Sequence, residues 1–327
     1  MTGRRLLAPP AGVARRASIG PLLQRWGVYL GLLAMLAISA GISPESFNPR
    51  DLLNLAKQAA GLGIAAIGQT LVILTGGIDL SVGSTISLIH VVSVGTILGR
   101  PEMVLPVSMG CLLLGGAIGA LNGLGVTRGR ISPLIMTLCM DFILRGAAMI
   151  YTGGQPRGVV PDNLRFLGRG RVFDIVPVAV LVWIAIALLF IFLLRRTTFG
   201  ARLYAVGANP RTAWLSGVRT DRTIFLTYTL AGALAAAAAL VVTGDLGAVS
   251  LGVGGDYTMD TIAAVVIGGT AFVGGIGGIE GTVAGAFIIR LLASLLQKAN
   301  VANPGRLILQ GALILLMVGA YSRRRRS

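Results

Sequence analysis

The chain consists of long apolar runs separated by short polar or arginine-containing segments along most of its 327 residues. A helix needs about 20 apolar residues to cross the hydrocarbon core of a bilayer. Ten runs approach this length, and they lie at residues 26–42, 52–74, 82–98, 103–126, 132–152, 173–194, 223–243, 258–273, 282–296 and 307–321. The sequence therefore predicts an all-α polytopic membrane protein with about ten transmembrane helices.

The net charge is +16, and arginine supplies almost all of the positive charge. A strongly basic chain could bind nucleic acid, but these arginines lie at the ends of the apolar runs and in the segments between them. Basic residues accumulate in the cytoplasmic segments of membrane proteins. Membrane orientation therefore explains the charge, and we expect no nucleic-acid partner.

Two arginine-rich tails, at residues 1–25 and 322–327, flank one predicted membrane domain at residues 26–321. An even number of spans puts both tails on one side, and the positive-inside rule places them in the cytoplasm of a bacterial inner membrane. The basic segment 195–222 then also lies inside. The segment 153–172 is an exception, because this topology puts its four arginines outside. Either that segment binds something acidic or the count of spans is wrong nearby.

Two glycine-rich breaks interrupt the apolar pattern, one in each half of the chain. The first contains Gly76, Gly77 and the carboxylate of Asp79, and the second contains Gly268, Gly269, Gly274 and Gly275. Broken helices at membrane depth occur where backbone lines a cavity or is buried in protein. Paired breaks in the two halves also suggest an inverted repeat of five plus five spans around a transport path.

Three charged side chains within the apolar runs are candidates for the path. Asp79 either caps the helix that follows it or contacts the transported solute. Asp141 and Arg145 are four residues apart, so one helix face carries both. They form either a structural ion pair or a contact with the solute.

Five stretches of the chain, taken in order, resemble the permease subunit of ribose-type sugar ABC importers. These are Gly68–Ser84 with its Gly-Gly-Ile-Asp-Leu-Ser-Val-Gly-Ser run, 120–138 with Ile-Ser-Pro-Leu-Ile-Met-Thr-Leu, 144–154 with Leu-Arg-Gly and Tyr-Thr-Gly-Gly, 198–218, and 260–275 with Asp-Thr-Ile-Ala-Ala-Val-Val-Ile-Gly-Gly. The resemblance implies a permease for a monosaccharide or related polyol. Its partners would be a second permease copy or a paralogue, a separate ATP-binding subunit, and a sugar-binding protein outside the membrane.

The chain itself agrees with a separate ATPase, because it contains no Gly-x-x-x-x-Gly-Lys-Ser/Thr loop to hold phosphates. It also has one histidine and no nucleophile–base set or metal cluster, so we expect no enzymatic activity, metal or cofactor. Two alternatives remain, a related ABC permease for branched-chain amino acids and a standalone secondary transporter. The second would need its own ion-coupling carboxylates.

The segment 195–222 resembles the loop that couples such permeases to their ATPase. Asn209 is suited to cap a short helix, with Pro210 in its first turn. We expect this helix to continue through Ala213 and Ser216 and to end at Gly217. Gly207 precedes it and completes the candidate coupling residues.

Gln69, Thr70 and Asn122 are neutral polar residues within predicted spans. Hydrogen bonds between helices are the simplest role for each of them. Sugar hydroxyls need the same kinds of donor and acceptor, so all three remain candidates for the translocation path.

Overall fold

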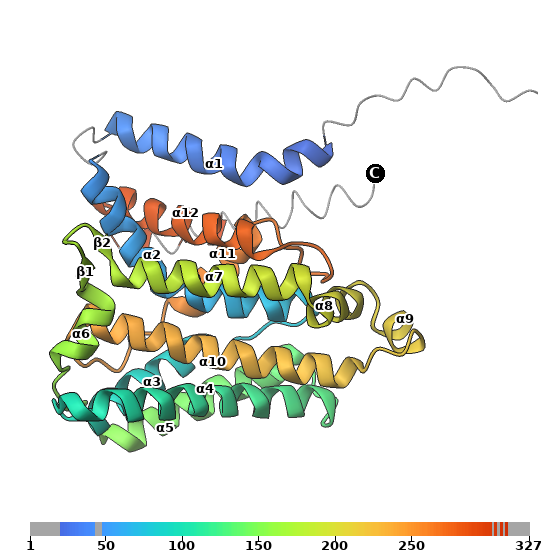
Figure 1. Cartoon of the computed structure of the whole chain (residues 1–327), viewed down its shortest axis with the longest axis horizontal. Coiled ribbons are helices and arrows are strands. Elements are labelled where there is room, and N and C mark those ends of the chain that lie inside the picture. The colour runs from blue at the N-terminus through green and yellow to red at the C-terminus, as the bar shows by residue number, and fades with distance from the viewer. Residues whose placement is uncertain (1–19, 43–47, 303, 306–307, 310, 313–327) are drawn as a thin grey trace, which may run out of the picture.

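The computed structural model describes residues 20–42, 48–302, 304–305, 308–309 and 311–312, and these form a helical bundle (Figure 1). The long helices are α1 (Gly20–Ile42), α2 (Pro49–Leu74), α3 (Val82–Ile97), α4 (Val104–Thr127), α5 (Pro133–Thr152), α7 (Val178–Arg196), α10 (Thr220–Leu246), α11 (Tyr257–Ile267) and α12 (Ile279–Lys298). The shorter elements are the 3-10 turn η2 (Pro101–Met103), α6 (Asp162–Arg169), α8 (Thr198–Ala208), α9 (Pro210–Leu215), and an antiparallel hairpin of β1 (Arg171–Val172) and β2 (Val176–Pro177).

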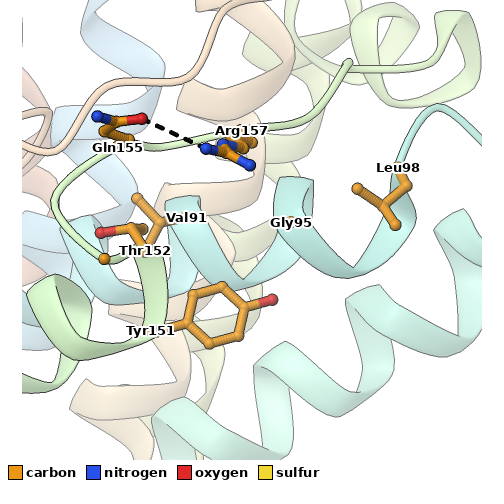
Figure 2. Close-up of a pocket in the computed structure, with 8 residues that line it drawn as sticks. Val91, Gly95, Leu98, Tyr151, Thr152, Gln155 and Arg157 are labelled. Carbon is orange, nitrogen blue, oxygen red and sulfur yellow. Dashed lines mark hydrogen bonds between the residues drawn. The ribbon is translucent and has the colours of Figure 1, made fainter.

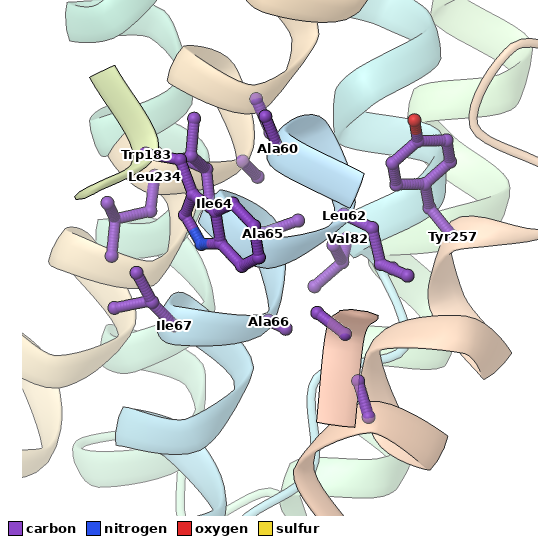
Figure 3. Close-up of a cluster of buried hydrophobic side chains, with 14 of the residues drawn as sticks. Ala60, Leu62, Ile64, Ala65, Ala66, Ile67, Val82, Trp183, Leu234 and Tyr257 are labelled. Carbon is purple, nitrogen blue, oxygen red and sulfur yellow. The ribbon is translucent and has the colours of Figure 1, made fainter. Parts of the chain in front are cut away.

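Helix α2 runs through the core of the bundle. Its side chains from Ala59 to Leu74 are all buried, and they contact α3, α7, α10 and α11 (Figure 3). Trp183 of α7 lies directly over Gly63, where any larger side chain would meet its indole ring. A helix that is apolar on all sides is expected at such a central position.

Helices α4 and α10 approach each other closely through small residues. A Cβ atom at Gly115 would lie 2.5 Å from the Gly232 carbonyl oxygen, and one at Gly232 would lie 2.2 Å from the Gly115 carbonyl oxygen. Small residues allow this close contact, which replaces the hydrophobic effect as the source of helix association in lipid. The abundance of glycine in the chain is therefore partly a packing requirement.

The segment between α10 and α11, residues 247–256, is non-helical and runs along α3. The Ser250 amide donates to His90 Nε2 over 3.2 Å, and the Gly254 amide donates to Ser87 Oγ over 3.0 Å. His90 Nδ1 lies 2.8 Å from Thr243 Oγ1 on α10. These side chains satisfy backbone groups that would otherwise be unpaired at membrane depth.

Six helices in the described part of the chain are long and apolar enough to cross a membrane, and three shorter apolar helices lie at Gly27–Gly41, Val82–Ile97 and Tyr257–Ile267. The chain is thus a multi-pass α-helical membrane protein. Most of the tenth predicted span, 307–321, lies outside the described residues, as do the C-terminal tail 322–327 and most of the N-terminal tail 1–25.

Two predicted spans extend by five or six residues into backbone that is not helical. The span 173–194 was placed too early, because Phe173 and Asp174 have positive φ angles in the hairpin turn and α7 begins only at Val178. The span 258–273 was extended too far, because α11 ends at Ile267. In both places an apolar run continues through backbone that is not helical.

Three of the four arginines in segment 153–172 bind other parts of the fold, which the sequence did not reveal. Arg165 and Arg169 donate to carbonyl groups at Asp245, Leu246 and Gly247, where α10 ends. Arg171 donates to Asn54 Oδ1 over 2.7 Å. Cations at a helix C-terminus are stabilised by its unpaired carbonyls. Three of these four arginines therefore serve the fold, and Arg157 is left for another role.

Candidate functional site

The first break lies between α2 and α3, at residues 75–81, and it buries Asp79. This side chain is 3% exposed, and its Oδ1 accepts hydrogen bonds from the Ser81 amide over 2.8 Å and the Ser81 hydroxyl over 2.6 Å. Ser81 is the N-cap residue of α3. Asp79 therefore holds the residue that begins α3 and does not itself cap the helix.

Side chains from three neighbouring helices form hydrogen bonds at this break and at the start of α3. Asn122 of α4 donates to Ser81 Oγ over 2.9 Å. Thr137 of α5 donates to the Ile78 carbonyl and accepts from the Leu80 amide. Thr258 of α11 accepts from the Gly83 amide over 3.1 Å. The Thr137 and Thr258 hydroxyls thus satisfy backbone groups of residues 78 and 80, while Asn122 holds the side chain of Ser81.

Asp141 and Arg145 lie on one face of α5, with 2.8 Å between Asp141 Oδ2 and Arg145 Nε. The Asp141 side chain is 8% exposed and interacts electrostatically with Asp79, whereas 61% of the Arg145 side chain is exposed. An exposed guanidinium near the middle of a membrane helix is costly unless it faces water or protein. This edge of α5 therefore does not suit contact with lipid.

The two polar candidates on α2 have different surroundings. Thr70 Oγ1 lies 2.8 Å from Thr282 Oγ1, which joins α2 to α12 away from the first break. Gln69 is fully buried, and neither atom of its amide has a hydrogen-bond partner among the described residues. Thr70 therefore serves helix packing, while Gln69 carries unused hydrogen-bonding capacity.

The second break, residues 268–278, meets the first break at the end of α8. The Gly275 amide donates to the Leu74 carbonyl at the end of α2 over 2.9 Å. A Cβ at Gly207 of α8 would lie 1.8 Å from that same Leu74 oxygen and 2.5 Å from the Gly275 amide nitrogen. Only glycine at position 207 permits this approach, so one residue of the coupling segment contacts the second break and the last residue of α2, which directly precedes the first break.

Further contacts from α7 and α8 reach the second break and the start of α12. The Tyr204 hydroxyl donates to the Gly277 carbonyl over 2.9 Å, and Arg195 forms an ion pair with Glu280 over 2.6 Å. Burial, with a smaller contribution from the Glu280 charge, raises the pKa of Tyr204 above its usual value. The Tyr204 hydroxyl therefore stays protonated and able to donate at neutral pH.

Helix α9 projects beyond the end of the bundle (Figure 1). Asn209 caps it by accepting from the Thr212 amide over 3.0 Å, Pro210 occupies its first turn, and Gly217 follows with φ +81°. Ala213 is buried, whereas Trp214 and Leu215 are 65% and 71% exposed. The short helix that the sequence predicted is present, and α8 before it was not predicted.

The site also includes residues that the sequence analysis did not select. Thr137 was recognisable, because it lies four residues before Asp141 on the same face of α5. Ser81 lies within the first break itself. Thr258 and the buried Tyr228, whose hydroxyl adjoins Gly77, gave no signal because they come from distant parts of the chain.

Glycine-broken helices around a buried carboxylate, in a multi-pass bundle without enzymatic groups at the break, define a membrane transport protein. Residues 52–318 match the family described as the permease component of branched-chain amino acid transport systems. The chain is 37% identical to the ribose import permease of Bacillus subtilis (strain 168) over 93% of this chain and 94% of that protein.

Other permeases show comparable sequence identity and coverage. Identity is 37% to the ribose import permease of Escherichia coli (strain K12), covering 88% of this chain and 91% of that protein. It is 31% to the D-allose transport system permease of the same strain, covering 90% of each chain. No solved structure matches the chain significantly. The chain belongs to the ABC permease family that includes the ribose import permeases.

Proposed function

We propose that this chain is the translocation subunit of an ATP-driven importer for a monosaccharide or related polyol, with D-ribose as the first substrate to test. The relatives named for ribose and D-allose import support a sugar rather than an amino acid. The neutral hydroxyl and amide groups around Asp79, from Ser81, Asn122 and Thr137, suit a solute rich in hydroxyl groups.

The observation that carries the proposal is the contact of Gly207 with the second break and with Leu74, the residue directly before the first break. α9 is exposed where a separate ATP-binding subunit could hold it, and α8 connects it directly to Leu74 and Gly275. Movement of α9 would therefore displace the end of α2, five residues before Asp79. This gives a short mechanical route from ATP binding to the translocation path.

We also propose a membrane topology and an assembly for this chain. We place the chain in the bacterial inner membrane with ten spans, an inverted repeat of five plus five, and both termini in the cytoplasm. The permease domain covers residues 26–321, with the tails at 1–25 and 322–327 and the coupling segment at 195–222. A soluble sugar-binding protein docks outside, and no cofactor takes part.

A second permease copy or a paralogue completes the path. The exposed guanidinium of Arg145 supports a water-filled route along α5 between the two subunits, because lipid is a poor environment for it. Exchanging Asp141 and Arg145 distinguishes a structural ion pair from a pair that lines the translocation path. A swapped pair that restores protein level but not uptake favours the pathway.

The coupling proposal is tested with Gly207→Ala in the complete transporter reconstituted in liposomes. We expect the variant to insert, and to hydrolyse ATP without accumulating D-ribose, because its Cβ would displace the Leu74 carbonyl. Gly110→Ala is the matched control, since no atom lies within 4 Å of the added Cβ. Coupled uptake at the unmodified rate in Gly207→Ala contradicts this route.

Asn209→Ala tests the α9 contact by a milder change. Without the Asn209 side chain that accepts from the Thr212 amide, α9 should be destabilised by about 1 kcal/mol. Less ATP-binding subunit should then co-purify with the permease. Unchanged co-purification would assign the contact to another surface. Import of leucine instead of D-ribose by the unmodified transporter would favour the amino-acid alternative.

A further inference from the structure

A surface pocket of about 430 Å³ lies where α3 and α5 end, at the end of the bundle opposite α9. Its floor is the face of α3 at Gly95, with the Tyr151 ring on one side and the Gln155 and Arg157 side chains on the other (Figure 2). The volume lies within the range of roughly 300–1,000 Å³ that is usual for small-molecule sites.

The packing around Gly95 gives the pocket a defined wall. A Cβ at this position would lie 2.9 Å from the Tyr151 hydroxyl oxygen, so only glycine lets the phenol ring lie against α3. The Tyr151 hydroxyl also lies 3.1 Å from Thr96 Oγ1. The ring is thus positioned by two neighbouring residues of α3, while 47% of Tyr151 remains exposed.

Arg157 differs from the other arginines of its segment. Arg165, Arg169 and Arg171 donate to backbone or side-chain groups of α10 and α2, whereas Arg157 donates to the neutral Gln155 Oε1 over 3.3 Å. No ion pair of Arg157 with a carboxylate occurs within the described residues. Its other N–H groups are therefore available to a ligand in the pocket.

The lining combines one aromatic ring with hydroxyl, amide and guanidinium groups. Thr152 adds another oxygen to those of Tyr151, Gln155 and Arg157. A sugar presents apolar C–H faces that pack on an aromatic ring, and hydroxyl groups that accept from Arg and exchange hydrogen bonds with amides and hydroxyls. Nothing in the lining is acidic, so the pocket favours a neutral or anionic polyol over a cation.

The pocket lies on the same face of α5 as the candidate path. Thr152, Arg145, Asp141 and Thr137 are spaced seven, four and four residues apart, so they follow one stripe along α5. That stripe ends at the first break, where Thr137 holds the backbone of residues 78 and 80. The stripe therefore carries polar side chains from the pocket to the residues that surround Asp79.

We infer that this pocket is an outer binding site for a monosaccharide on the permease itself, formed by Tyr151, Gln155 and Arg157. The inference rests on the proposed function, since it assumes that the transported solute is a sugar. It assigns to the permease a first contact with the sugar, separate from the binding protein that delivers it.

The test measures sugar binding to the purified full-length permease in lipid nanodiscs, without any partner protein. Saturation-transfer NMR with millimolar D-ribose, and with D-allose in a parallel sample, should show binding to the unmodified chain. Arg157→Gln and Tyr151→Phe should each weaken it roughly tenfold, the effect of losing one charge-assisted or well-placed hydrogen bond. Gly95→Ala should weaken it as well, by displacing the Tyr151 ring.

Two variants serve as matched controls. Thr96→Val removes the same internal hydrogen bond as Tyr151→Phe but leaves the phenol hydroxyl in the pocket, so binding should persist. Arg128→Gln removes an exposed arginine at the opposite end of α4 and should also leave binding unchanged.

Equal binding by the unmodified chain, Arg157→Gln and Tyr151→Phe overturns the inference, as does absence of binding by the unmodified chain to both sugars. Uptake of D-ribose by the complete transporter tests the proposed function independently. Normal uptake with no pocket-dependent binding therefore removes the outer site and leaves the proposed function intact. Loss of binding-protein docking in Arg157→Gln, with sugar binding unchanged, also overturns the inference, because the pocket would then serve the protein partner.

Discussion

The two glycine-rich breaks differ in what holds them. Residues 75–81 are fixed by side chains, with Asp79, Asn122 and Thr137 supplying hydrogen bonds around the unwound backbone. Residues 268–278 are fixed mainly by backbone contacts, such as the Ala271 amide with the Ile276 carbonyl and the Gly275 amide with the Leu74 carbonyl. The first break therefore depends on hydrogen bonds from side chains, whereas the second depends on close backbone packing, including its contact with α8.

The largest expected effect comes from the carboxyl group of the first break. Asp79→Ala removes the acceptor of two hydrogen bonds from Ser81, so the start of α3 loses its support. Buried hydrogen bonds to an acidic group contribute about 1.5–3 kcal/mol each, so we expect uptake to fall by roughly 100-fold while the protein still inserts. Normal uptake of D-ribose by Asp79→Ala would remove this residue from the mechanism.

At the second break, we expect a larger side chain in place of glycine to lower the stability of the protein. Gly275→Ala places a Cβ 2.7 Å from the Ala208 amide nitrogen at a residue with φ +71°, so both crowding and backbone strain oppose it. We expect a loss of about 2 kcal/mol in stability. Thermal unfolding in detergent measures it, with Gly252→Ala as a control that has no atom within 4 Å. Equal melting temperatures for the two variants would mean that the second break is not tightly packed.

Thr137→Val tests whether the first break depends on α5. The substitution keeps the side-chain shape but removes the hydroxyl that joins Ile78 and Leu80 to α5. We expect a loss of about 1–2 kcal/mol in thermal stability, with lower uptake, and Thr137→Ser should restore both. If Thr137→Ser behaves like Thr137→Val, the methyl group and not the hydroxyl is the important part.

The smallest effect should come from Tyr204→Phe, which removes one partly buried hydrogen bond to Gly277 of the second break. We expect about 1 kcal/mol. Because burial raises the Tyr204 pKa above its ordinary value of 10.0, the hydroxyl donates at every pH below that value and fails only as the pH rises further. The difference in melting temperature between the variant and the unmodified chain should therefore be the same at pH 7 and pH 9.

Local sequence signals located several parts of the fold and of the candidate site. Apolar run length predicted the membrane helices, and Asn209, Pro210 and Gly217 correctly bounded α9. The spacing of Asp141 and Arg145 predicted their pairing on α5. Each of these features depends on residues within a few positions of one another, where helix geometry alone fixes which side chains meet.

The sequence failed where contacts link distant residues. Apolar character could not distinguish the hairpin at 171–177 from the start of α7, because hydropathy does not report backbone conformation. The arginines of segment 153–172 appeared anomalous until Arg165 and Arg169 were seen at the end of α10, about 80 positions away in the chain. Charge counting alone cannot identify such partners.

By itself, the sequence determined that this protein is a multi-pass helical membrane protein with two glycine-rich breaks, because bilayer thickness and the cost of buried charge leave few other ways to fold such runs. Only the tertiary structure decided that Gly207 contacts the second break and the end of α2. It also decided that Asp79 holds Ser81, while Asn122 and Thr137 hold the first break. It also distinguished Arg157 from Arg165, Arg169 and Arg171, which donate to groups of α10 and α2. The physical reason is that close packing and hydrogen bonding depend on which helices become neighbours, and that information is not local in the chain.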